Sequence, residues 1–206
     1  MPGRTLLRRM DKRRVEAFSD GVFAIAMTLL VLEIRRPSAG DPHSLATQLR
    51  DHWPSYLAYV TSFLQLAVVW VNHHQVFDHI RRANTALLFL NSLFLMVICV
   101  SPFPMAVVAE FLDSGRDERG AVLLYGSTFT LMAILFSVLW YYAALGGRLI
   151  DPAMRESARQ ITRRFVPGVP IYTAGTLVAF LSPLVSVLIF TGLAILYAIP
   201  YERAET

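Results

Sequence analysis

The sequence is poor in cysteine and in charge. It has one Cys among 206 residues, Cys99, which lies in an apolar run, so an intrachain disulfide is excluded. Charged residues make up 17% of the chain and apolar residues 55%, and the mean hydropathy is +0.48. No polar region is long enough to form a core of its own. These shortages exclude a soluble domain and predict one all-α integral membrane domain over residues 1–206.

Several motifs are also missing. There is no Thr-Val-Gly-Tyr-Gly loop, which excludes an ion filter built from the usual ring of backbone carbonyls. His74 and Asp78 have ligand-like spacing, but no His-Glu-x-x-His and no second cluster of ligands accompany them. We therefore expect no metal site and no cofactor. The apolar run near the N-terminus is too long for a secretory signal peptide and lacks a cleavage site.

The sequence does contain apolar runs long enough to cross a membrane. The first, Arg14–Ile34, would reach about 30 Å as a helix, which is the thickness of a bilayer's hydrocarbon core. It contains no charge from Gly21 through Leu32, and Thr28 is the only polar side chain in that stretch. This run therefore predicts the first transmembrane helix.

Six crossings are predicted in all. Pro102 and Pro104 should kink or break the third run, because each proline removes a backbone donor. The last run is too long for one crossing, and Ser182-Pro183 should divide it into two. The expected crossings are Arg14–Ile34, Trp53–Phe77, Ala86–Phe111, Ala121–Leu145 and two within Phe165–Tyr201.

The polar connections set the expected topology. A short surface helix is predicted to begin at an Asp41-Pro42 cap and to reach about Arg50, and a second is expected within Gly146–Arg164. Of the 19 basic residues, 14 fall on the side of the two termini in this six-crossing arrangement. By the positive-inside rule, both termini are cytoplasmic in a multi-pass protein of the plasma membrane. The net charge of +4 thus reflects topology and does not predict nucleic-acid binding.

The first predicted helix has two different sides. On a wheel of about 100° per residue, one stripe is apolar apart from a single hydroxyl. The opposite side carries Ser19 and Asp20, and a buried Asp needs a partner because leaving it unpaired in a membrane is costly. The stripe consists of Phe18, Val22, Ile25, Thr28, Leu29 and Leu32. The polar residues at the same depth on the next two helices are Trp70, Asn72, His73, His74 and Asn91.

The segment Arg14-x-x-x-Phe18-Ser19-Asp20, followed directly by GVFAIAMTLLVLEI, resembles the first helix of the endosomal and lysosomal potassium channel family. It is most similar to the bacterial members, which have one six-helix unit per chain. No second copy of the motif occurs in this sequence, so a single-unit chain must assemble from several copies. The resemblance implies a homotetramer that is embedded in a lipid bilayer and passively conducts potassium ions.

The resemblance also implies roles for individual residues. Ile25, Leu29 and Leu32 match the family's apolar pore constriction, and Thr28 matches its hydroxyl layer. A pore of this kind filters and gates through side-chain rings around the axis, with no carbonyl loop. A further set of mostly polar residues, on the pore helix and on the two helices behind it, would form a structural network that fixes the rotation of the pore helix. These are Arg14, Phe18, Ser19, Asp20, Trp70, Asn72, His73, His74 and Asn91.

Two other classes of function compete with a potassium channel. A secondary transporter usually has paired broken helices, and here only the third run appears broken. A proton-permeable cation pathway is the related alternative. An intramembrane enzyme could use Ser19, Asp20 and His73 or His74, but no oxyanion site is evident, so we expect no catalytic residues and no enzymatic activity.

Overall fold

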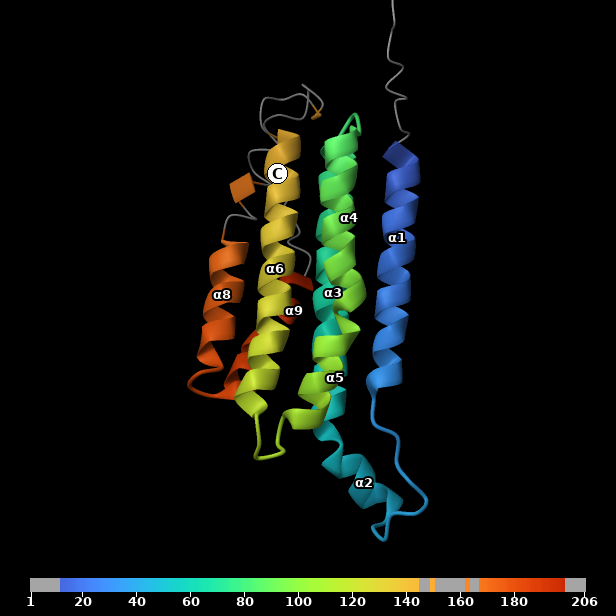
Figure 1. The fold of residues 1–206 in the computed structure, drawn as a ribbon, viewed down its shortest axis with the longest axis vertical. Helices are drawn as coiled ribbons and strands as arrows, with labels where there is room; N and C mark the ends of the chain where they lie inside the picture. Colours follow the sequence, from blue (N-terminus) through green and yellow to red (C-terminus); the bar gives the residue numbers. More distant parts are fainter. Residues whose placement is uncertain (1–11, 145–148, 151–161, 164–166, 199–206) are drawn as a thin grey trace, which may run out of the picture.

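The computed structural model describes residues 12–144, 149–150, 162–163 and 167–198. In this part of the chain the fold is all-α, and Figure 1 shows the longer helices running side by side. The elements are α1 (Lys12–Leu29), the 3₁₀ helix η1 (Leu30–Glu33), α2 (Leu45–Asp51), α3 (Trp53–His79), α4 (Thr85–Val100), α5 (Pro102–Phe111), α6 (Glu118–Ala144), α8 (Gly168–Val178) and α9 (Pro183–Ala198).

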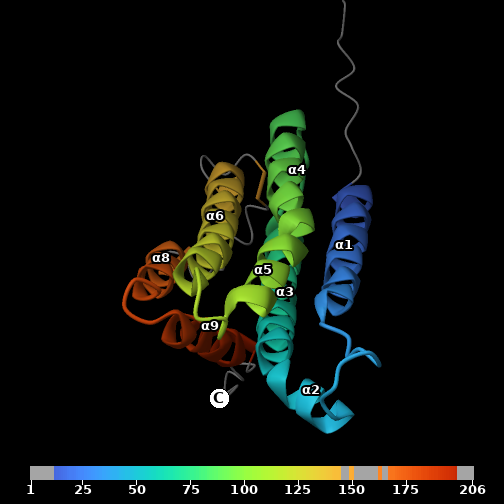
Figure 2. The same cartoon turned by 60° about the horizontal axis from the view of Figure 1, so that its bottom comes forward.

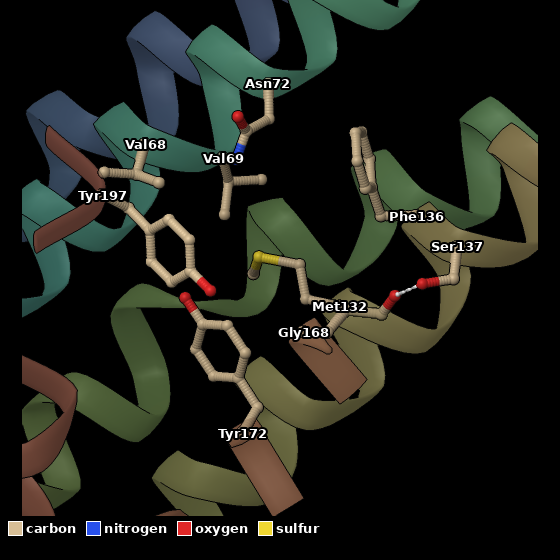
Figure 3. A pocket seen from close by; sticks show the side chains of 10 residues that line it. Val68, Val69, Asn72, Met132, Phe136, Ser137, Gly168, Tyr172 and Tyr197 are labelled. Carbon is tan, nitrogen blue, oxygen red and sulfur yellow. Dashed lines mark hydrogen bonds between the residues drawn. The ribbon is translucent and has the colours of Figure 1, made fainter. Parts of the chain in front are cut away.

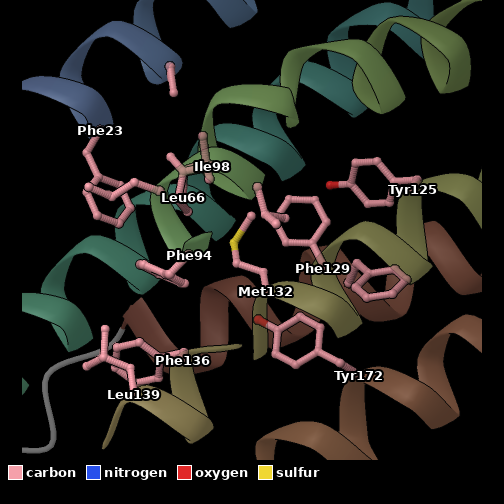
Figure 4. Close-up of a cluster of buried hydrophobic side chains, with 14 of the residues drawn as sticks. Phe23, Leu66, Phe94, Ile98, Tyr125, Phe129, Met132, Phe136, Leu139 and Tyr172 are labelled. Carbon is pink, nitrogen blue, oxygen red and sulfur yellow. The ribbon is translucent and has the colours of Figure 1, made fainter. Parts of the chain in front are cut away.

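The helices form a bundle with α1 on one flank and the α8–α9 hairpin on the other (Figure 1). The core between them is apolar and rich in aromatic rings. Phe23 of α1 and Phe94 of α4 approach to 6.1 Å between ring centroids, and Phe136 of α6 lies 5.6 Å beyond Phe94. Figure 4 shows how this cluster continues through Met132 toward Tyr172 on α8. The core thus ties α1 to the rest of the bundle by one face only.

Four helical segments are long and apolar enough to cross a membrane: Lys12–Glu33, Trp53–His79, Thr85–Phe111 and Glu118–Ala144. This supports the predicted multi-pass membrane protein. The last two helices are shorter, with 11 residues in α8 and 16 in α9. At 1.5 Å per residue they reach about 17 Å and about 24 Å, less than the hydrocarbon thickness. The six-crossing arrangement therefore remains a prediction.

Both breaks predicted at prolines are confirmed. Helix α4 ends at Val100, and α5 begins at Pro102, one residue later. The hydroxyl of Ser101 donates to the carbonyl of Ile98 at 2.7 Å, so a carbonyl near the end of α4 gains a partner. In the last run, α9 begins at Pro183, because proline tolerates the first helical position, where no N–H is needed.

One predicted boundary is wrong, and one helix changes type near its end. The first segment runs over Lys12–Glu33, close to the predicted Arg14–Ile34, but it is α-helical only to Leu29 and then tightens into η1. The surface helix α2 starts at Leu45 and not at Asp41, because Ser44 caps it by accepting the N–H of Thr47 at 3.2 Å. Asp41 accepts the backbone N–H of His43, and this bond holds the pKa of the Asp41 carboxyl below its usual value. Most of the second predicted surface helix lies outside the described residues.

Helices α6 and α8 approach closely at one glycine. A Cβ atom added to Gly126 would lie 2.5 Å from Oγ1 and 3.0 Å from Cβ of Thr176 on α8. The Thr176 side chain is held in place because its hydroxyl donates to the carbonyl of Tyr172 and lies 3.1 Å from that of Thr130. Only glycine therefore fits at position 126 without a shift of the Thr176 side chain or of one helix.

We predict that Gly126→Ala destabilises the protein by about 1–3 kcal/mol, the usual cost of overpacking. The control is Gly192→Ala on α9, where nothing lies within 4 Å of the added Cβ. That change should stabilise the protein by up to about 1 kcal/mol through helix propensity. Thermal unfolding in detergent compares the two glycine variants. The double variant Gly126→Ala/Thr176→Ala should lose less stability than the sum of the losses in Gly126→Ala and Thr176→Ala. Equal unfolding temperatures for both glycine variants would refute the close approach.

Candidate functional site

Helix α1 presents one buried face and one exposed face. Val15, Ser19, Phe23 and Ala26 are buried against α3 and α4, at the spacing of one helical stripe. The apolar stripe predicted from the helical wheel lies on the other side. There Phe18 is 63% exposed, Ile25 62%, Leu29 40% and Leu32 73% in the single chain, whereas Val22 is half-buried. The largest exposed apolar side chains of α1 therefore share one side.

A chain of hydrogen bonds runs from α1 to α3 through α4. The hydroxyl of Ser19 donates to the carbonyl of Val15 at 2.9 Å and accepts the side-chain amide of Asn91 at 3.0 Å. The amide oxygen of Asn91 lies 2.9 Å from Nε2 of His73. Because that oxygen can only accept, Nε2 of His73 must be the donor. Ser19, Asn91 and His73 are all buried, and the chain uses each polar group without leaving one of these atoms unpaired.

Aromatic rings enclose the imidazole of His73. Phe94 stacks on it with a centroid distance of 5.7 Å and an interplanar angle of 4°. Phe77 lies at 4.4 Å and Phe23 at 5.6 Å. These rings fix the imidazole and exclude water from its bond to Asn91. Sequence reasoning missed this enclosure, although the spacing of four residues between Ser19 and Phe23, and between His73 and Phe77, places each pair on one helix face.

Asp20 has a different partner. The indole N–H of Trp70 donates to its carboxylate at 2.9 Å, which gives the half-buried acid a hydrogen bond without a counter-charge. The imidazole of His74 lies beside Trp70, with centroids 6.3 Å apart, and approaches Asp78 at 3.9 Å. Neither His73 nor His74 bonds to Asp20. The predicted network is thus two separate connections, one through Ser19 and one through Asp20.

The structure places three of the predicted network residues elsewhere. Arg14 and Phe18 are exposed, with Phe18 on the same side of α1 as Ile25. Asn72 lines a small cavity of about 70 Å³ together with Tyr172 and Tyr197 (Figure 3). Consecutive residues on a helix differ by about 100°, so Asn72 and His73 face different neighbours. The sequence could place Asn72 at the right depth but not on the right side of α3.

The exposed side of α1 carries one oriented hydroxyl. Thr28 donates to the carbonyl of Ile25 at 2.8 Å, so its oxygen keeps its lone pairs for a cation or a water. One residue after Leu29 the backbone becomes the 3₁₀ helix η1. Residues three apart eclipse each other in that geometry, which favours alignment of Leu29 with Leu32. An acceptor oxygen therefore lies between aliphatic side chains on this surface.

The comparisons with known proteins agree on one family. Residues 14–102 match the family model described as endosomal/lysosomal potassium channel TMEM175. A potassium channel of Streptomyces collinus is 46% identical over 173 residues, which are 84% of each chain. The endosomal/lysosomal proton channel TMEM175 of Bos taurus is 33% identical over 180 residues, covering 83% of this chain and 37% of that protein.

The fold comparison gives the same result. The crystal structure of a lysosomal potassium-selective channel TMEM175 homolog from Chamaesiphon minutus superposes with a TM-score of 0.83 at 40% identity. The match covers 91% of this chain and 96% of that one. The likeness therefore extends over most of both chains.

We predict that Asn91→Leu destabilises the protein by about 1–3 kcal/mol, because it keeps the volume but leaves the buried Nε2–H of His73 unpaired. Ser92→Ala is the matched control, since the exposed Ser92 hydroxyl only bonds back to the carbonyl of Leu88. Denaturant unfolding in detergent measures both variants. If Asn91→Leu unfolds at the same denaturant concentration as Ser92→Ala, the hydrogen-bond chain does not hold α1 in place.

Proposed function

Because this chain belongs to the endosomal/lysosomal potassium channel TMEM175 family, we propose that it is a potassium channel whose pore is lined by α1 from four copies. The family consists of ion channels and not of enzymes. The observation that carries the pore assignment is the shared exposure of Ile25 and Leu29 on α1 and of Leu32 on η1, together with the exposed, oriented hydroxyl of Thr28.

Two surroundings are possible for this side of α1: lipid, or further copies of α1 around an axis. Lipid would need only apolar side chains and gives no role to a lone acceptor oxygen there. Four copies around an axis would place Ile25, Thr28, Leu29 and Leu32 in successive rings. Aliphatic rings block ions by excluding water, and a hydroxyl ring can replace part of the hydration shell of K⁺. The central arrangement therefore explains all four residues.

The two buried connections support the pore by fixing the rotation of α1. A turn of α1 by one residue, about 100°, would move Ile25 off the axis. Such a turn would also break the bonds from Asn91 to Ser19 and from Trp70 to Asp20. Loss of the bond from Asn91 to Ser19 would leave buried polar groups unpaired, whereas Asp20 is half-buried and Trp70 is 39% exposed in the single chain. We assign Asp20 a positioning role, because it does not share the exposed stripe.

We propose that the chain crosses the plasma membrane six times with both termini in the cytoplasm. The four long segments supply four crossings. Helices α8 and α9 supply a shorter pair, joined by a tight turn at residues 179–182. Hydrogen bonds from Tyr172 to Gln65 and from Gln65 to the carbonyl of Phe190 tie this pair to α3. Because the polar groups of the pair find partners on α3, a short crossing can remain stable beside the longer helices.

The experiment that tests the pore uses the substitutions Ile25→Asn and Thr28→Val. Ile25→Asn wets the narrowest ring, so the potassium current in liposomes or planar bilayers should rise several-fold and the preference for K⁺ over Na⁺ should fall. Thr28→Val keeps the volume but removes the acceptor oxygen, so it should shift the reversal potential in mixed K⁺/Na⁺ toward that of an unselective pore.

Ile195→Asn is the matched control, since Ile195 of α9 is 50% exposed in the single chain and lies away from α1. It should leave current and reversal potential unchanged. A pore built elsewhere is indicated if the control alters conduction and the α1 variants do not. A pH gradient applied in the same assay distinguishes proton permeation, the alternative named for the animal relative, from potassium permeation.

We predict that the outer ends of α1 meet at the axis of a homotetramer. In a Cys99→Ser background, which removes the chain's one cysteine, Leu32→Cys should form disulfide-linked dimers in membranes under mild oxidation. Leu196→Cys on α9 is the control, because it is 64% exposed, similar to the 73% of Leu32. Efficient crosslinking at Leu196 with none at Leu32 would place α1 at the periphery. The mass of the detergent-solubilised complex gives the number of copies.

A further inference from the structure

A polar cavity of about 140 Å³ lies at the end of the bundle where η1 ends and α3 begins. Charged and polar side chains from four segments line it: the stretch after η1, the α2–α3 corner, the end of α5 and the loop before α6. Those used below are Arg35, Asp51, His52, Ser55, Glu110 and Asp113. With His52 neutral, three carboxylates and one guanidinium give these walls a formal charge of −2. The cavity therefore favours a cation over an anion.

Two residues that line this cavity each have a buried polar atom without a protein partner. The hydroxyl of Ser55 and Nδ1 of His52 are buried and make no hydrogen bond within the described residues, and Ser55 as a whole is only 1% exposed. A buried polar atom without a partner destabilises a protein, so such atoms normally mark a bound polar group or water. Both atoms can accept a hydrogen bond, and so can the carboxylates. The wall is thus suited to a ligand that donates hydrogen bonds.

The carboxylates are held in position around this space. Asp113 has a left-handed backbone, with φ of 77°, which is uncommon for a residue other than glycine. The indole N–H of Trp53 donates to its Oδ2 at 3.2 Å, which leaves its second oxygen free. Glu110 pairs with Arg35 at 3.5 Å. Arg35 lies two residues after Glu33, the last residue of η1, so the cavity adjoins the outer end of the proposed pore helix.

We propose that this cavity binds a hydrated divalent cation, Mg²⁺, and that binding lowers the potassium current. Mg²⁺ holds several waters while it contacts one or two carboxylates, and its waters are strong donors for Ser55 and His52. About 10–15 Å³ of such cavity space holds one water, so the cavity has room for several of them. A fully dehydrated ion fits less well, because no three acidic, His or Cys side chains lie together as direct ligands among the described residues.

The effect on current rests on the proposed function, whereas binding does not. A bound divalent charge beside the outer mouth reduces the negative potential that concentrates K⁺ there, so the current should fall. The carboxylates of Asp51 and Glu110 are 61% and 62% exposed. Solvent screens such exposed groups, so we expect weak binding with a Kd on the order of 1 mM, similar to that of extracellular modules for Ca²⁺.

The test measures Mg²⁺ binding to the purified full chain in detergent by isothermal titration calorimetry, at fixed K⁺. Asp113→Asn keeps the acceptor for Trp53 and tolerates the left-handed backbone, so it removes only the charge. Asp117→Asn is the matched control, because Asp117 lies on the same loop, also has a positive φ of 53°, and does not line the cavity. Asp113→Asn and Ser55→Ala should each raise the Kd about tenfold, and Asp117→Asn should leave it unchanged.

Equal Kd values in all three variants, or no saturable binding up to about 20 times the expected Kd, would overturn the proposed site. The second measurement is the potassium current with Mg²⁺ added on the Arg35 side of the bilayer. Block that is lost in Asp113→Asn and Ser55→Ala but kept in Asp117→Asn supports the regulatory role. If Mg²⁺ lowers the current equally in all variants, it acts in the pore or by screening surface charge in general, and regulation through this cavity is refuted. Binding without any channel activity in the unmodified protein would instead contradict the proposed function and leave the site standing.

Discussion

The structure depends on one constraint: polar groups buried in a membrane protein must find partners within the protein, since the surrounding lipid offers none. Ser19, Asn91 and His73 meet it with a chain of hydrogen bonds across three helices. The rings of Phe23, Phe77 and Phe94 close around that chain. Few rotations and depths of α1 satisfy all these contacts at once, so a small polar cluster determines which side of α1 remains exposed.

That constraint matters more here than in a channel with a backbone filter. A ring of carbonyls is positioned by its own loop, whereas a side-chain ring is only as well placed as the helix that bears it. If α1 lines the pore, an error in its rotation would replace Ile25 by a neighbouring residue at the axis. The bond from Trp70 to Asp20 adds a second restraint one residue from the first. Two restraints in adjacent positions resist rotation better than either one alone.

The hydropathy of the sequence was sufficient to predict the long helices and the breaks at Pro102 and Pro183, because chain length and missing backbone donors act locally. It also identified the depth at which polar side chains meet. The sequence could not assign hydrogen-bond partners, since Ser19 and Asp20 are adjacent and either side chain could reach α3. The position of Asn72 on a cavity wall, apart from His73, depends on how α3 packs against α6 and α8. The change from α-helix in α1 to 3₁₀ helix in η1 likewise could not be predicted from the amino-acid composition of this segment.

The end of α1 links the proposed pore to the outer cavity. Leu29 ends α1 and Leu32 lies in the 3₁₀ turn of η1. Residues three apart stay on one side in either kind of helix, so this turn is compatible with successive rings of Leu29 and Leu32 in the proposed pore. Leu30 is fully buried and holds the turn from inside the bundle. Arg35 and Glu110 hold the segment that follows. A 3₁₀ helix has poorer hydrogen-bond geometry than an α-helix, so it depends on such anchors at both ends. The proposed outer rings therefore lie next in sequence to the segment that carries Arg35, which lines the cavity.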